Sequence, residues 1–280
     1  MPKVPVLPNI ITAFALTCGL FMIFRMNMVP VGGADLHVLT VTAGILLLAA
    51  LADLMDGAVA RILRAESSFG GFFDSLADGI TFGLGPSVIV LKTMSLEPGS
   101  GYSFLMTMAA MVFSVCGILR LVRFNVMSLQ AKENPDPLDN AKKHFTGLPI
   151  PAAAVSIVSL NLFFYSDEWK WLGIPLEPYR FWILFTAMLL IGYFMVSRWK
   201  FPSLKTLHIR VSSFQKVLFT VVAAVFLFYG ILNFFPLTFL IVSWGYVFIA
   251  ASLSIARVIA GRRSKALEEF EPEPETDEES

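Results

Sequence analysis

Four aspartates lie at the ends of two neighbouring apolar segments, at spacings that place each pair on one face of a helix. Asp53 and Asp56 are three residues apart, and Asp74 and Asp78 are four apart; residues so spaced are neighbours on a helix surface. A short connection between antiparallel helices would bring the two pairs together. Converging carboxylates repel one another unless cations hold them. Oxygen ligands without His or Cys favour Mg²⁺ or Mn²⁺ over zinc, so the pattern predicts a site for two divalent ions.

The segment between the two pairs is rich in small residues and contains an arginine. Gly57, Ala60 and Gly70 allow a ligand to approach the backbone closely. Arg61 offers a fixed cation with paired donors for phosphate oxygens. Divalent ions, an arginine and small residues together predict a ligand that carries a diphosphate.

The composition explains where these aspartates must work. Apolar residues make up 56% of the 280-residue chain and charged residues 15%, and the mean hydropathy is +0.71, which is too apolar for a soluble domain. The 21 basic and 21 acidic residues balance, which excludes a strongly basic nucleic-acid binder. An Asp inside a membrane span costs about 2.5–3.5 kcal/mol and usually marks function. The four aspartates are therefore candidate functional residues of a membrane protein.

Apolar runs long enough to cross a bilayer as helices occur eight times, so we expect an all-α integral membrane protein with about eight transmembrane helices. Their predicted ranges are 10–28, 37–55, 72–94, 103–121, 149–165, 181–196, 217–235 and 237–259. Only Pro236 separates the last two, which predicts a tight turn there.

The distribution of Lys and Arg between the connections predicts the orientation. Seventeen basic residues fall on the side of the N-terminus and four on the other, and basic loops stay in the cytoplasm. Both termini and the aspartate site are thus expected at the cytoplasmic face of the cell membrane. Residues 266–280, which carry eight acidic side chains from Glu268 onward, are expected to be a disordered tail.

The aspartates also carry a family resemblance. The positions from Asp53 to Asp78 match the pattern D-x2-D-G-x2-A-R-x8-G-x3-D-x3-D at all eight fixed residues, and this pattern resembles that of the CDP-alcohol phosphotransferase family. The resemblance implies a membrane enzyme in which an alcohol displaces CMP from a CDP-linked lipid, with two divalent ions, Mg²⁺ or Mn²⁺. It also implies a homodimer and a catalytic domain over 1–265, with a six-helix core at about 8–215 and extra helices at about 216–260.

The resemblance further implies a role for each matching residue. Asp53, Asp56 and Asp74 would be metal ligands, and Asp78 would be both a ligand and the general base that accepts the alcohol proton. The residues expected to contact CDP-diacylglycerol are Asn9, Thr12, Gly57, Ala60, Arg61, Ser67 and Gly70.

Further strings resemble the integral-membrane phosphatidylserine synthases of bacteria and archaea. They lie at 8–12, 69–86, 120–125 and 147–154, and Thr81 and Ile150 depart mildly from that pattern. The resemblance implies L-serine as the acceptor of the phosphatidyl group. Serine needs a cation for its carboxylate, and the candidate binding residues are Arg120, Arg123 and Asn125, with Arg123 and Asn125 as the leading pair.

Several alternatives remain open from the sequence. Each of the two arginines could instead be an ordinary positive charge at a helix end or could bind a lipid phosphate. The acceptor could be glycerol 3-phosphate, inositol phosphate or choline rather than serine. A cation transporter is disfavoured, because transport sites lie near the bilayer midplane and Arg61 would repel a transported cation.

Overall fold

The computed structural model describes residues 6–30, 33–63, 67–133, 147–173, 177–197 and 227–268. Every regular element within these ranges is a helix, which confirms the predicted all-α class. Four of the described helices are long and apolar enough to cross a membrane, as expected of a multi-pass membrane protein. They are α1 (Val6–Met28), α2 (Leu36–Ile62), α5 (Gly101–Glu133) and α10 (Phe235–Glu268).

The predicted third span, 72–94, is helical but not regular. It consists of α3 (Ser68–Asp78), the π-helical segment η1 (Gly79–Leu84) and α4 (Gly85–Met94). Pro86 lies just after η1, and a proline inside a helix lacks an N–H and clashes with the carbonyl four residues earlier. Widening of the preceding turn is one way in which a helix accommodates such a break. The change of geometry begins directly after Asp78.

The later spans follow the prediction in part. The fifth and sixth are the short apolar helices α7 (Ile150–Tyr165) and α8 (Arg180–Val196). Most of the seventh predicted span, 217–235, lies outside the described residues. The part of it that is described includes 227–233, which are helical. The break before the eighth falls at Phe234, and Pro236 lies in the first turn of α10, where its missing N–H is not needed. Since α10 extends to Glu268, residues 266–268 of the expected tail are helical; 269–280 lie outside the described residues.

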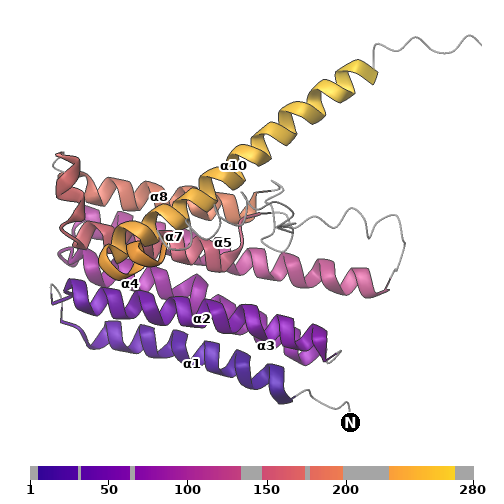
Figure 1. The fold of residues 1–280 in the computed structure, drawn as a ribbon, viewed down its shortest axis with the longest axis horizontal. Helices are drawn as coiled ribbons and strands as arrows, with labels where there is room; N and C mark the ends of the chain where they lie inside the picture. The colour runs from indigo at the N-terminus through magenta and orange to yellow at the C-terminus, as the bar shows by residue number, and fades with distance from the viewer. Residues whose placement is uncertain are drawn as a thin grey trace, which may run out of the picture.

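The helices form a bundle around α7 (Figure 1). Eleven of the 16 residues of α7 are buried, as expected of a helix that is apolar on all sides. It packs against α2, α4, α8 and α10, while α1 packs along α2 and α5 along α8. Large apolar side chains are exposed on α1, α2 and α5, as lipid-facing helices require. The C-terminal half of α10 projects beyond the packed helices (Figure 1).

Polar side chains join α4, α7 and α8 at the end of the bundle opposite the aspartates. The Tyr165 hydroxyl donates to the carbonyl of Thr93, and Asn161 Nδ2 donates to Thr93 Oγ1 over 2.9 Å. The guanidinium of Arg180 lies 4.2 Å from the centre of the Tyr165 ring, a favourable cation–π arrangement. Because lipid offers no hydrogen-bond partners, these contacts hold the three helices together.

The last described helix, α10, is fixed to the bundle by polar contacts at three depths. The hydroxyls of Ser159 and Ser243 are 2.7 Å apart, and Trp244 Nε1 donates to the carbonyl of Ser156 over 2.9 Å. At the N-terminus of α10, the backbone N–H of Leu237 donates to Glu168 over 2.7 Å. Burial raises the pKa of Glu168, and the Leu237 N–H partly offsets this rise.

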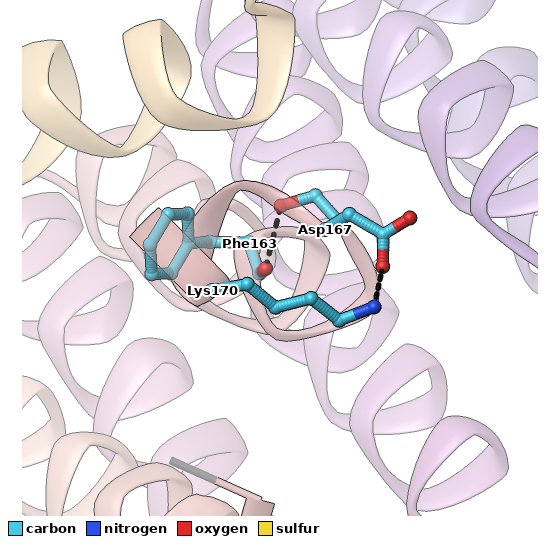
Figure 2. Close-up of polar contacts among 4 residues, drawn as sticks. Phe163, Asp167 and Lys170 are labelled. Carbon is cyan, nitrogen blue, oxygen red and sulfur yellow. Dashed lines mark hydrogen bonds and ion pairs between the residues drawn. The ribbon is translucent and has the colours of Figure 1, made fainter. Parts of the chain in front are cut away.

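Glu168 belongs to the connection between α7 and α8, which contains the 3-10 helices η2 (Glu168–Leu172) and η3 (Glu177–Tyr179). Figure 2 shows the start of this connection, where Asp167 and Lys170 form an ion pair. Both side chains are exposed, and such pairs contribute little to stability. The capping of α10 by Glu168 is therefore the contact of this connection that matters most for the fold.

Glycine at position 19 is required by the packing of α1 on η1. A Cβ added there would overlap the side chain of Thr81, which is itself buried. We expect Gly19→Ala to destabilise the protein by about 1–3 kcal/mol through overpacking, with a lower unfolding temperature in detergent. Gly44→Ala in α2 is the control: its Cβ meets nothing within 4 Å, and alanine favours a helix. Equal unfolding temperatures for the two variants would contradict this packing.

Candidate metal centre and active site

Three of the four predicted carboxylates converge in the structure. Asp53 and Asp56, near the C-terminus of α2, and Asp74, on α3, each offer an oxygen within 4.8 Å of the other two. Asp56 is buried, and the other two are partly exposed. The antiparallel approach of α2 and α3 thus brings the two pairs together, as the spacing predicted.

The donor set fits a hard divalent cation. Mg²⁺ binds oxygens at about 2.0–2.1 Å, so two ligands of one ion are at most about 4.2 Å apart. The oxygens of the three carboxylates lie within 4.8 Å of one another, which is close to that limit. Asp53, Asp56 and Asp74 could therefore hold such an ion, and a divalent ion there would offset the repulsion between them.

Helix α1 orients one of these carboxylates. Thr12 Oγ1 donates to Asp56 Oδ2 over 2.6 Å, and both residues are buried. A hydrogen bond of this kind fixes the rotamer of a metal-binding carboxylate. Thr12, predicted as a substrate contact, therefore acts in the structure on Asp56.

Asp78 lies one turn further into the bundle than Asp74, at the last residue of α3. It is not part of the group of three carboxylates, although it interacts electrostatically with Asp53 and Asp74. It also lies within electrostatic range of the guanidinium of Arg120 on α5. Asp78 thus interacts electrostatically both with the other carboxylates and with a cation from another helix.

The residues predicted to contact the nucleotide fall into two groups. Ser67 caps α3 by accepting a hydrogen bond from Gly70 N over 3.0 Å, and a Cβ on Gly70 would lie 3.2 Å from Asn9 Oδ1. Asn9 Nδ2 is buried and has no hydrogen-bond partner among the described residues, so it can donate to a ligand. The second group lies at the end of α2, beside Asp56, and comprises Gly57, Ala60 and the exposed Arg61.

The three residues proposed for serine have different surroundings. Arg123 donates to the carbonyls of Val196 and Ser197 over 3.0 and 3.5 Å and thereby caps the C-terminus of α8. Asn125 Nδ2 donates to Ser75 Oγ over 2.9 Å and joins α5 to α3. Both side chains therefore make structural contacts.

Arg120 differs from its two neighbours in the predicted set. It lies within electrostatic range of Asp78, and its Nε is buried without a hydrogen-bond partner among the described residues. A buried N–H without a partner is costly, so a bound anion would satisfy it. Of the three, Arg120 is the one with a buried donor left for a bound anion.

Two features of the site region were not predicted from the sequence. Tyr246 on α10 lies within electrostatic range of Arg120, and no local spacing relates these two residues. Gly147 has a φ of +89°, which favours glycine, and a Cβ there would overlap the carbonyl of Met195. The next residue, Leu148, donates its N–H to the carbonyl of Phe194 over 3.0 Å, so this segment is held beneath the end of α8.

We expect Asp56→Asn and Thr12→Val to weaken Mn²⁺ binding, because the first removes a charged ligand and the second releases it from its orienting bond. The loss for Thr12→Val should be about tenfold and that for Asp56→Asn larger, by paramagnetic-resonance titration of the purified protein. Asp35→Asn is the control, since Asp35 caps the other end of α2 and asparagine caps equally well. Unchanged affinity in Asp56→Asn would contradict the metal site.

The chain is similar in sequence to known proteins. Residues 5–192 match the family model described as CDP-alcohol phosphatidyltransferase. A CDP-diacylglycerol–serine O-phosphatidyltransferase of Mycobacterium leprae is 34% identical over 195 residues, which cover 67% of this chain and 56% of the relative. The enzyme of the same name from Helicobacter pylori strain 26695 is 30% identical over 213 residues, covering 75% of this chain and 78% of the relative.

An archaetidylserine synthase of Methanothermobacter thermautotrophicus is 37% identical over 126 residues, which cover 44% of this chain and 47% of the relative. The match thus spans little more than half the length of the Mycobacterium relative and less than half of the archaeal one. The family model covers most of the chain, including all four aspartates. On this evidence, the chain belongs to the CDP-alcohol phosphatidyltransferase family.

Proposed function

We propose that the protein transfers the phosphatidyl group of CDP-diacylglycerol to the hydroxyl of L-serine and releases CMP. The observation that carries the proposal is the convergence of Asp53, Asp56 and Asp74, with Asp78 and Arg120 in electrostatic range of each other and of Asp53. Carboxylates for metal ions, a base and a cation for the acceptor are the groups this reaction needs. The names of the similar proteins support serine as the acceptor.

In the proposed reaction the serine oxygen attacks the phosphorus that bears the diacylglycerol. The new P–O bond forms as the P–O bond to CMP breaks, and the serine proton passes to the carboxylate of Asp78. Two divalent ions, Mg²⁺ or Mn²⁺, held by Asp53, Asp56 and Asp74 with Asp78, would draw charge from the diphosphate and stabilise the leaving CMP. Asp78 suits the role of base because it borders the other three carboxylates and also faces α5.

The nucleotide side of the proposed site lies on α1, α2 and α3. The free Nδ2 of Asn9 can donate to the CDP moiety, and Arg61 can bind its phosphates. Gly57, Ala60 and Gly70 leave room for the ligand, while Ser67 fixes the start of α3 and Thr12 fixes Asp56.

The acceptor side is proposed to lie on α5. Arg120 is the cation for the serine carboxylate, since Arg123 and Asn125 already make structural contacts. This assignment differs from the prediction from sequence, in which Arg123 was the leading candidate for the serine carboxylate. Serine bound between Arg120 and Asp78 would have its hydroxyl close to the base.

We further propose that the site faces the cytoplasm at the cell membrane, with both termini on that side, as the seventeen basic residues there favour. A site at the membrane surface lets a water-soluble amino acid meet a lipid headgroup. A homodimer is proposed from the family resemblance.

Release of CMP from CDP-diacylglycerol in mixed micelles tests the proposed reaction. We expect product with L-serine and Mg²⁺ or Mn²⁺, no product after chelation of the metal, and none with glycerol 3-phosphate, inositol phosphate or choline. Activity with another alcohol but not with serine would overturn the acceptor. Absence of CMP with every alcohol would overturn the reaction class.

A second test concerns the base. We expect Asp78→Asn to abolish turnover, because the amide cannot accept the serine proton, while CDP-diacylglycerol still binds with an affinity close to that of the wild type. Binding is measured by the shift in unfolding temperature on addition of the lipid nucleotide. Normal turnover in this variant would show that Asp78 is not the base.

Substitutions of Arg120 and Arg123 should have different effects on the KM for serine. We expect Arg120→Ala to raise the KM for serine at least tenfold, because a charge-assisted hydrogen bond to the carboxylate is lost. Arg123→Ala should instead lower the unfolding temperature and leave the serine KM unchanged, since Arg123 caps α8. A higher serine KM in Arg123→Ala, with an unchanged serine KM in Arg120→Ala, would instead assign the serine carboxylate to Arg123.

A further inference from the structure

The helix that carries Asp74 and Asp78 contacts α5 through small residues at every fourth position. They are Ser75, Gly79, Gly83 and Ser87. Ser75 is bonded to Asn125, and a Cβ on Gly79 would lie 3.7 Å from Leu121. Further along, a Cβ on Gly117 would lie 3.6 Å from Gly83 Cα, and Ser87 donates to the carbonyl of Ala110 over 3.0 Å. Small residues allow two membrane helices to approach closely, and this row is the contact line between them.

On a regular α-helix this row would wind part of the way around the surface. At about 100° per residue, a four-residue step overshoots a turn by about 40°, so three steps from Ser75 to Ser87 drift by about 120°. The i→i+5 bonding of a π-helix gives roughly 4.4 residues per turn, or about 82° per residue. The six π-helical residues of η1 therefore remove about 108° of that drift. The π turn is what keeps both halves of the helix against α5.

One side chain of α5 holds this turn. Ser114 Oγ donates to the carbonyl of Gly83, inside η1, over 3.0 Å, and it lies 2.9 Å from Ser87 Oγ. Pro86 lacks the N–H that would bond an earlier carbonyl of η1, four residues back in the pattern of an α-helix. A carbonyl without a donor finds no water within the membrane. Ser114 adds a donor to this turn from α5, at the neighbouring carbonyl of Gly83.

The contact line determines how Asp78 meets Arg120. Gly79 on one helix meets Leu121 on the other at this line. Asp78 directly precedes Gly79, and Arg120 directly precedes Leu121. In an antiparallel pair, the residues that precede two facing positions point to the same side of the contact line. A rotation of α3 relative to α5 would separate the two side chains.

We infer that Ser114 is a positioning residue for the acceptor side of the site: by holding the π turn of η1 against α5, it keeps Asp78 opposite Arg120. The inference deepens the proposed function and rests on it. Ser114 contacts Gly83 and Ser87, at the end of the contact line that lies away from the carboxylates. It therefore acts through the register of the two helices and does not contact the substrate.

Kinetics of Ser114→Ala in the CMP-release assay test the inference. We expect the KM for serine to rise about three- to tenfold, the range that corresponds to one lost hydrogen bond. The KM for CDP-diacylglycerol should stay within about twofold, because that substrate binds on α1, α2 and α3. Ser114→Thr keeps the hydroxyl and should restore the serine KM.

Thr107→Ala is the matched control, because Thr107 is also a hydroxyl residue of α5 but donates only to Ser103 of its own helix. It should behave as the wild type. A wild-type serine KM in folded Ser114→Ala, or an equal rise in both KM values, would overturn the inference. A lower yield of folded protein with unchanged KM values would also overturn it. Absence of serine-dependent CMP release in the wild type would instead overturn the proposed function.

Discussion

The concentration of negative charge in an apolar bundle is the constraint on which the rest of the structure depends. Asp53, Asp56 and Asp74 come within 4.8 Å of one another, with Asp78 one turn away, in a chain whose helices face lipid. Carboxylates in such surroundings must be neutralised by cations or take up protons. A membrane protein can maintain this arrangement only if several helices fix the carboxylates and if counter-charges approach from other directions.

Two neighbouring helices meet this need in different ways. Helix α1 reaches the group through the bond from Thr12 to Asp56, and Gly19 lets it lie against η1. Helix α5 contributes the cation Arg120 opposite Asp78, at a distance governed by the small residues along its contact with α3 and η1. The proposed reaction uses this division, with the lipid nucleotide on the side of α1 and α2 and the amino acid on the side of α5.

The part of the bundle beyond the family match is also tied to this framework. Helix α10 lies outside residues 5–192, yet it is bonded to α7 through Ser243 and Trp244 and is capped by Glu168. Helix α7 also packs against η1, so α10 supports the segment that follows Asp78 indirectly, through α7. Its Tyr246 also lies within electrostatic range of Arg120, so the last helix belongs to the surroundings of the site.

The sequence by itself determined the all-helical membrane class, the helical character of the first six predicted segments and the carboxylates of the site. These follow from local properties: the length of apolar runs, and the helical period that places Asp53 with Asp56. The tertiary structure decided which arginine faces the site, because Arg120 and Arg123 are equivalent by composition and differ only in rotation about the axis of α5. It also decided the π turn after Asp78, which depends on how Pro86 and the small residues pack against α5. Contacts such as Ser114 with Gly83 and Thr12 with Asp56 join residues far apart in the chain, and no spacing along the chain specifies them.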